Sequence, residues 1–465
     1  MVFLKRIKKE QLILFFILIV SVFMRFYHIG QRAGFSWDEE TIAWKVKSIL
    51  VDHKPTLIGM KAGEFSIFTG PALIYILSLV YLIFSLNPIG IVICASLLSM
   101  FTTILFYKLG SRIFSKRIGL MSALVFAGSY SLSNYDRSWL LFSFFITSLL
   151  IFYFLYMSVK TKKLVFLILL SLFIGYSFHV HITAIFFPPI IILVLLLLRP
   201  KFKLKDYLIS LFIFLPWFIP IIFFDIRHDF LNIRGILKLL VSSGQTHYLL
   251  NAKKLFILLF ENLSAVFIPS YPKIILTISE FLLVLFFIIK KGIKEAKIII
   301  FLWLIIPLII LLPYKNNIPE YYLMATFPVL VLLGGILADI IFKLNKLTFF
   351  VTVVIFLGLN LKNRFNEPLD PYGLKAKNEI IDKIQSDSNN QKFNAYYFSR
   401  LGLDNGFSYL FWYKKTLLSE KEVSKKYTII MPKEYYSKQA DFSAGYIEVL
   451  KKQLPGMRQI IFGKI

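Results

Sequence analysis

The chain alternates between long apolar runs and short polar connections for most of its length. The longer runs approach the ~20 residues that an α-helix needs to cross a bilayer. Because lipid offers no partner for free backbone N–H and C=O groups, we expect these runs to form helices. The runs cover residues 11–28, 70–86, 88–109, 118–133, 138–158, 164–179, 182–198, 206–224, 253–269, 273–290, 297–313, 321–342 and 347–361.

The positions of Lys and Arg set the predicted topology. Membrane proteins keep the basic residues of their short loops on the cytoplasmic side. Treating every run as a span would place the basic cluster 108–117 outside. If runs 70–86 and 253–269 instead lie along the outer surface or re-enter, every basic cluster falls inside. We therefore predict about eleven spans, with the N-terminus in the cytoplasm and the C-terminus outside. The clusters are 108–117, 160–163, 199–205, 290–297 and 343–346.

The first apolar run resembles the core of a signal peptide but differs from one in two respects. It is long for such a core, and no small-residue cleavage site follows it. It also follows four basic residues, Lys5, Arg6, Lys8 and Lys9. We expect an uncleaved first span.

From Asn363 onward the chain becomes polar and mixed in composition. One stretch spaces its apolar residues as a helix does, and three have strand composition. The helical stretch is 378–385, and the strand-like stretches are 393–398, 427–432 and 458–463. We predict an all-α polytopic membrane domain over 1–362 and a small extracytoplasmic α/β domain over 363–465. A loosely folded tail is the alternative.

The composition agrees with a membrane protein and argues against several other classes of protein. The 465 residues are 57% hydrophobic and 17% charged, whereas soluble domains are roughly half apolar and a quarter charged. The net charge of +27 follows from the basic loops, which argues against nucleic-acid binding. A single cysteine, Cys94, excludes an intramolecular disulfide and a cysteine-rich metal site. No P-loop, dinucleotide fingerprint, HExxH or GxSxG motif occurs, so ATP-driven transport has no support.

An acidic cluster lies just beyond the first span, on the predicted outer side. The segment GFSWDEETIAW contains Asp38, Glu39 and Glu40, and it follows Arg25 at the membrane surface. A carboxylate there can act as a general base close to lipid headgroups. Three consecutive acids also occur on ordinary solvated helix faces, so position matters more than composition.

Two further segments place titratable residues at predicted outer turns. SLSNYDRSWLLF contains Asp136 and Arg137, which is also the pattern of an interfacial ion pair beside a belt residue, Trp139. GYSFHVHITAIFFPP contains His179 and His181. Neutral His is a good metal ligand or proton carrier, although a His pair at an interface is more often structural.

The last candidate segment is PYKNNIPEYYLMATFPVL. Lys315 precedes Tyr321 and Tyr322 at the outer start of a span. Lys is a common phosphate partner. The alternative is a Lys that extends its amine to the headgroups.

Taken in order, these segments resemble the glycosyltransferase C superfamily, and more closely the protein mannosyltransferase and aminoarabinose transferase group, glycosyltransferase family 39. The resemblance covers about 1–345. Two positions depart from the family pattern: Phe68-Thr69-Gly70-Pro71 where the family often has Lys, and Glu320 where it often has Arg. The matching segments are MRFYHIG…FSWDEETIAWK, FTGPALIYILSLVYLIFSLNP, LFYKLGSRIFSKRIGLMSALVFAGSYSLSNYDRS, FHVHITAIFFPP and EYYLMATFPVLVLLGG.

The resemblance implies an enzyme of the cytoplasmic membrane with an extracytoplasmic active site. It would transfer a sugar from a polyprenyl phosphate to a hydroxyl of a glycan, lipid or protein. Asp38 becomes the candidate base. Glu39 and Asp136 would orient the acceptor or bind a divalent metal. The remaining candidates would bind substrate: Arg25, Arg137 and Lys315 at the lipid phosphate, with His179, His181, Tyr321 and Tyr322 nearby.

Two other readings stay open. A transporter or flippase for lipid-linked glycans would need charged residues midway through its spans. In this chain ionisable residues lie mainly at the ends of the runs, which favours the enzyme. The other alternative is a non-catalytic scaffold that keeps the fold.

Overall fold

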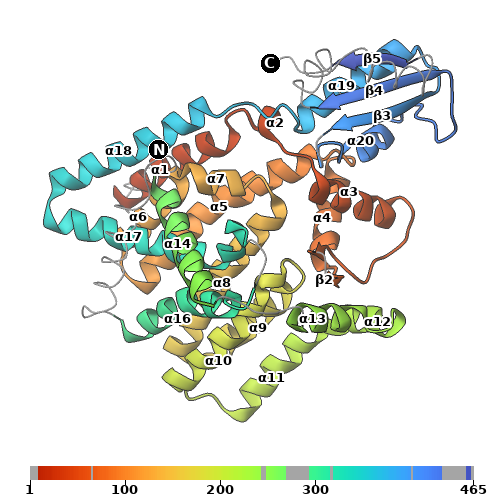
Figure 1. Ribbon diagram of the computed structural model, residues 1–465. Coiled ribbons are helices and arrows are strands. Elements are labelled where there is room, and N and C mark those ends of the chain that lie inside the picture. Colours follow the sequence, from red (N-terminus) through yellow and green to blue (C-terminus); the bar gives the residue numbers. More distant parts are fainter. Residues whose placement is uncertain are drawn as a thin grey trace, which may run out of the picture. The chain divides into compact units, whose positions relative to one another are not determined.

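The computed structural model describes residues 9–63, 66–241, 248–268, 293–314, 318–399, 402–431 and 457–461 (Figure 1). The chain divides into two compact units. Unit 1 contains Met1–Tyr27, Thr56–Leu73 and Cys94–Glu367. Unit 2 contains His28–Pro55, Ile74–Ile93 and Pro368–Ile465.

Unit 1 is almost entirely helical. Its α-helices are α1 (Lys9–Phe26), α6 (Lys116–Gly128), α7 (Tyr130–Tyr135), α8 (Trp139–Thr161), α9 (Leu164–Ser177), α10 (Phe187–Leu198), α11 (Leu204–Phe214), α12 (Ile219–Arg227), α13 (Leu231–Val241), α14 (Tyr248–Phe267), α16 (Lys294–Leu311), α17 (Phe327–Leu344) and α18 (Lys346–Asn366). The 3₁₀ helices are η1 (Ile182–Phe186), η2 (Leu215–Phe218) and η3 (Glu320–Thr326), and a short hairpin pairs β1 (Lys61–Ala62) with β2 (Ile67–Phe68).

Two helices cross the division between the units. They are α4 (Ala72–Ile83) and α5 (Ile89–Ile113). With twelve residues, α4 is about 18 Å long at 1.5 Å per residue. That is shorter than the ~30 Å hydrocarbon core of a bilayer. The expectation that run 70–86 lies along the outer surface or re-enters stays a prediction.

Five helical stretches in the described part of the chain are long and apolar enough to cross a membrane. They are Ile89–Ile113, Trp139–Thr161, Leu204–Arg227, Glu320–Leu344 and Lys346–Asn366. Shorter apolar helices occupy Leu164–Ser177 and Ile182–Leu198. The total of about eleven spans stays a prediction, and run 273–290 lies outside the described residues.

Several apolar runs are broken where the sequence contains a capping residue or a proline. Run 118–133 forms two helices, because Ser129 adopts an extended backbone between them and its Oγ accepts from Leu132 N at 3.3 Å. Run 206–224 forms α11, η2 and α12, with a proline in the first turn of each of the last two. α10 and α17 also have a proline in their first turn, and each follows a 3₁₀ helix directly.

The interior of unit 1 is built from aromatic and aliphatic side chains. Phe106 of α5 lies 4.9 Å from Phe126 of α6, and Phe126 stacks on Phe145 of α8 at 5.4 Å between ring centroids. α6 also packs against α1 and α17, and α8 packs against α9. α7 packs against α1, α14 and α18, so the ends of α1 and α7, where Arg25 and Asp136 lie, are close together.

Unit 2 combines helices from the segment that follows α1 with the C-terminal residues. Its helices α2 (Ile29–Arg32) and α3 (Trp37–Leu50) come from the N-terminal part, and α19 (Leu374–Ser388) and α20 (Phe407–Tyr413) come from the C-terminal part. A parallel sheet has the order β3 (Phe393–Ser399), β4 (Lys425–Met431) and β5 (Met457–Ile461) (Figure 1). The helix and the three strands that the sequence predicts beyond residue 363 are therefore present. The boundary at 362/363 and independent folding of 363–465 stay predictions.

Candidate active site

The acidic segment forms the first turn of α3. Ser36 is the N-cap, and its N–H and Oγ–H both donate to Glu39 Oε2, at 3.0 and 2.7 Å. This capping box satisfies backbone groups that the helix itself leaves unpaired. It explains why the helix begins at Trp37. It also gives Glu39 a local structural role.

The two neighbouring acids have different surroundings. The Glu40 carboxylate accepts from Gly406 N at 2.6 Å and from Tyr409 N at 2.8 Å, at the start of α20. The exposed Asp38 carboxylate makes no hydrogen bond or ion pair within the described ranges. Partial desolvation, and then the negative charge of Glu39, raise the pKa of Asp38 above the ordinary carboxyl value. Asp38 is thus the acid of the three that is available to a substrate.

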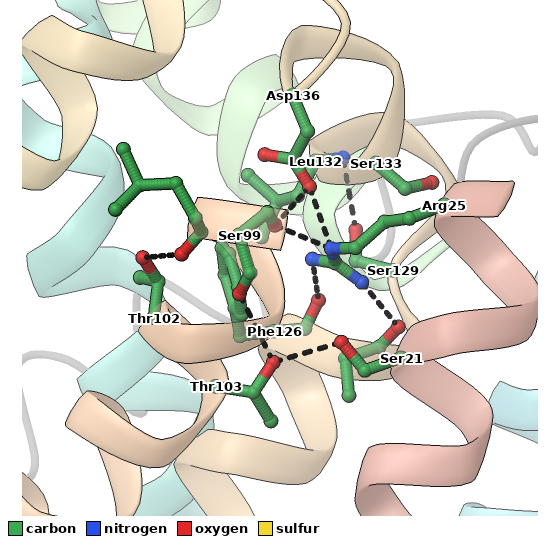
Figure 2. Close-up of polar contacts among 12 residues, drawn as sticks. Ser21, Arg25, Ser99, Thr102, Thr103, Phe126, Ser129, Leu132, Ser133 and Asp136 are labelled. Atoms are coloured by element: carbon green, nitrogen blue, oxygen red, sulfur yellow. Dashed lines mark hydrogen bonds and ion pairs between the residues drawn. The ribbon is translucent and has the colours of Figure 1, made fainter. Parts of the chain in front are cut away.

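A buried polar network in unit 1 joins α1, α5, α6 and α7 (Figure 2). Arg25 Nε lies 2.9 Å from Asp136 Oδ2, and both side chains are almost completely buried. Ser99 accepts from Arg25 Nε and donates to the same Asp136 oxygen at 2.5 Å. The two terminal nitrogens of Arg25 donate to the carbonyls of Ala127 and Phe126 at 3.1 and 3.2 Å. Arg25 and Asp136, which the sequence assigns to phosphate and acceptor, therefore bind each other.

Arg137 belongs to a second cluster. Its two terminal nitrogens donate to the two oxygens of Glu367 at 2.8 and 3.1 Å, which is a bidentate ion pair. Arg364 also contacts Glu367, and it donates to Ser133 and to Asn134 Oδ1. The cluster has two cations and one carboxylate among these members, so it carries an excess of positive charge.

His179 joins the entry of α4 to η2. Its Nδ1 accepts from Ala72 N at 3.0 Å, and its Nε2 lies 2.7 Å from Trp217 O. The carbonyl can only accept, so Nε2 carries the proton and Nδ1 does not. Gly70 lies directly against the ring, because a Cβ there would come within 2.2 Å of His179 Nδ1. Both ring nitrogens are used in these contacts.

The structure brings three predicted substrate-binding residues together. The ring centroid of His181 lies 6.1 Å from that of Tyr321 and 5.8 Å from that of Tyr322. His181 also caps η1, because its Nδ1 accepts from Thr183 N at 3.3 Å, and Thr183 Oγ1 lies 2.7 Å from the same nitrogen. The three rings are half-buried. Lys315, the fourth candidate of this group, lies outside the described residues.

Glu39 and Asp136, the predicted metal ligands, already have protein partners. Across the described ranges, no three His, Cys, Asp or Glu side chains gather closely enough to hold an ion. The carboxylate of Glu39 is engaged by Ser36, and that of Asp136 by Arg25 and Ser99. In the described part of the chain, Glu39 and Asp136 are therefore not arranged as metal ligands.

The sequence matches a known family over one segment. Residues 69–224 match the family of dolichyl-phosphate-mannose-protein mannosyltransferases. A curated but uncharacterised protein of Aquifex aeolicus is 28% identical over 225 residues. That alignment covers 47% of this chain and 45% of the relative, so it spans less than half of either protein.

Solved structures resemble the chain over most of its length. ArnT of Cupriavidus metallidurans, bound to undecaprenyl phosphate, has a TM-score of 0.57 at 12% identity, over 95% of this chain and 90% of ArnT. The chain shares its fold with ArnT. A second similar structure is the archaeal oligosaccharyltransferase AglB of Archaeoglobus fulgidus, in complex with an inhibitory peptide and a dolichol-phosphate. It has a TM-score of 0.50 at 10% identity, over 88% of this chain and 63% of AglB.

Two parts of this candidate site were not foreseen from the sequence. The spacing Ser36-x-x-Glu39 is a capping-box signature, and it was available as a signal. No local pattern indicated that Glu40 reaches Gly406 and Tyr409, or that Glu367 pairs with Arg137, because these partners are far apart in the chain.

Proposed function

We propose that the chain is a glycosyltransferase that moves a sugar from a polyprenyl phosphate to an acceptor hydroxyl on the outer face of the membrane. The shared fold with ArnT, which was solved with undecaprenyl phosphate, and the mannosyltransferase match over 69–224 support this class. The observation that carries the catalytic assignment is the contrast among three consecutive acids. Glu39 and Glu40 are engaged, and Asp38 is exposed with no partner in the described structure.

In the proposed step Asp38 acts as general base. Its carboxylate takes the proton of the acceptor hydroxyl while the acceptor oxygen bonds to the anomeric carbon of the donor. The bond between that carbon and the phosphate oxygen breaks, and its electron pair leaves with the polyprenyl phosphate. Because the acceptor attacks from the side opposite the leaving group, the configuration at the anomeric carbon is inverted. The products are the glycosylated acceptor, the lipid phosphate and a proton, which passes from Asp38 to solvent.

We propose that the aromatic cluster of His181, Tyr321 and Tyr322 binds the substrate. Its half-buried rings offer apolar faces and polar edges, which suit a sugar or the first part of a lipid chain. Lys315 and Arg137 remain our candidates for the lipid phosphate. Arg25 is the weakest of the three, because every nitrogen of its guanidinium already has a protein partner.

The central test is sugar transfer by purified protein in detergent, with a radiolabelled polyprenyl-phosphate sugar and a soluble acceptor. Detergent removes the barrier between the two sides, so a flippase alone would give no product. We expect Asp38→Asn to lower turnover by about 10²–10⁴-fold, the usual contribution of a general base. Near-normal turnover of Asp38→Asn together with loss in Asp136→Asn would move the base to Asp136.

The pH profile supplies a second readout on the same residue. The pKa of Asp38 is raised, and the base must be deprotonated, so activity should increase with pH through a value above that of an ordinary carboxyl. Glu39→Gln is a matched control. Gln can still accept from Ser36 in the capping box, but it removes the adjacent negative charge. We expect this variant to remain active, with its acidic limb moved to lower pH.

The nature of the sugar can be determined without choosing a substrate in advance. Mass spectrometry of lipids that copurify with the protein should reveal a polyprenyl-phosphate sugar. We expect Asp38→Asn to retain more of this lipid than the wild type, because the variant binds donor but does not consume it.

A further inference from the structure

The segment 31–40, which carries Asp38, is held within unit 2 by residues from the C-terminal part of the chain. The backbone contacts come first. Gln31 O accepts from Asp370 N at 3.1 Å, and Ala33 O accepts from Leu374 N at 2.7 Å. The second bond places the start of α19 against the residues that precede α3.

Lys377, one turn further along α19, makes the next contact. Its Nζ donates to Phe35 O at 2.7 Å and to Asn405 O. Its side chain is buried, at 2% exposure, and the amine lies 5.4 Å from the centre of the Phe407 ring. One buried amine therefore joins the residue before the N-cap of α3 to the residue before the N-cap of α20.

Glu40 makes the reciprocal contact from α3. Its two carboxylate oxygens accept separately from Gly406 N and Tyr409 N, at 2.6 and 2.8 Å. A carboxylate at a helix N-terminus is favoured by the unpaired N–H groups and by the helix dipole. Gly406 has φ +96°, and a Cβ there would come within 2.5 Å of Phe35 O. Only glycine allows this close approach in that conformation.

These contacts bracket Asp38 on both sides. Phe35 lies three residues before it, and Glu40 lies two residues after it. Asp38 itself takes no part in the contacts. We propose that Lys377 and Glu40 are positioning residues, which hold the first turn of α3 so that Asp38 points its carboxylate in one direction. The catalytic part of this inference depends on the proposed role of Asp38 as base.

The physical reason for such a device is the geometric demand of general-base catalysis. The base must lie within hydrogen-bond reach of the proton that it removes. A displacement of about 1 Å by a remote substitution can lower the rate by roughly 10²-fold. An exposed carboxylate on the first turn of a helix has few contacts of its own, so its position depends on what holds that turn.

The test uses the full chain and two substitutions with matched controls. Lys377→Met keeps the length of the side chain and removes both hydrogen bonds. Glu40→Gln keeps one acceptor and removes the charge and the second acceptor. Lys375→Met and Glu379→Gln are the controls, because these residues form an exposed pair on the same helix, 3.8 Å apart. Two quantities are measured: steady-state transfer from a polyprenyl-phosphate sugar, and amide hydrogen exchange across residues 37–43.

We expect Lys377→Met and Glu40→Gln to lower kcat by about 10–100-fold, with KM for the donor within about twofold of the wild type. Amides at the start of α3 should exchange faster, and those of α8 should not change. The controls should match the wild type. A general loss of folding would instead accelerate exchange in α8 as well. If Lys377→Met does not fold, Glu40→Gln carries the test.

Wild-type kcat and unchanged exchange in both variants would overturn the inference. Lower kcat without faster exchange at α3 would also overturn it, because the effect would then not act through this helix. A wild-type protein that transfers no sugar would contradict the proposed function instead. In that case the exchange measurement alone would decide whether Lys377 and Glu40 hold α3.

Discussion

Three consecutive acids illustrate how residues of one type acquire different tasks. Glu39 caps its own helix, Glu40 binds the N-terminus of α20, and Asp38 remains exposed. The sequence identified the cluster and preferred Asp38, but it grouped Glu39 with the catalytic residues. The structure supplies the distinguishing contacts, because capping and long-range anchoring are visible only once the partners are in place.

The Arg25–Asp136 pair leads to a prediction at the residue scale. Breaking a buried ion pair by removing one partner's charge costs about 3–5 kcal/mol, because the other charge stays buried and uncompensated. We therefore expect Asp136→Asn to destabilise the protein by a few kcal/mol. Asp38→Asn, at an exposed position, should change stability by no more than about 0.5 kcal/mol. The measurement is the denaturation midpoint of both variants in detergent.

A second substitution separates structure from chemistry at this pair. Replacing Arg25 with Met together with Asp136→Asn removes both charges, and it should recover part of the stability that Asp136→Asn alone loses. If Asp136→Asn is as stable as the wild type and yet inactive, the carboxylate has a chemical task that the buried pair does not explain.

At the scale of elements, the sequence located most helices from their long apolar runs, because lipid requires helical backbone pairing, and the three C-terminal strands from their composition. It merged neighbouring elements where one apolar run contains a local break, as at Ser129 and at the prolines of η2 and α12. It could not pair His179 with Ala72 and Trp217. Such contacts depend on how helices pack, and no periodic pattern encodes them.

The entry of α4 gives a prediction at this scale. Gly70→Ala would place a methyl group about 2.2 Å from the imidazole of His179, and overpacking of this kind typically costs 1–3 kcal/mol. We expect a lower unfolding temperature for Gly70→Ala. Gly358→Ala in α18 is the control, since nothing lies within 4 Å of its Cβ position. Alanine there should be neutral or stabilising by up to about 1 kcal/mol.

The cause of the lower stability of Gly70→Ala can be checked in a protein that also carries a substitution at His179. If the clash with the imidazole is responsible, Gly70→Ala should cost less in a protein that already carries His179→Ala. An equal cost in both backgrounds would point to the backbone of residue 70 rather than to the ring.

At the scale of the whole molecule, charge distribution predicts orientation. Lys and Arg of the short loops favour the cytoplasm, so Lys116 should be inside and the residues of α19 outside. The native Cys94 is the only cysteine, which makes labelling simple once it is replaced by Ser. In intact cells an impermeant maleimide should label Ser386→Cys and should not label Lys116→Cys. Both positions are exposed in the structure. The opposite labelling pattern would show that the protein has the reverse orientation in the membrane.

The contacts of Lys377 and Glu40 also have a consequence for the time course of biosynthesis. Lys377 and Phe35 are 342 residues apart, and Glu40 and Gly406 are 366 residues apart. At about 5–20 residues per second, the ribosome needs roughly 20–70 s to make the second partner after the first. During that interval the nascent chain contains the acidic segment but not the residues that hold it. If Asp38 is the base, as proposed, we expect a chain that ends before Gly406 to be inserted but inactive, because the contacts that hold the first turn of α3 are not yet made.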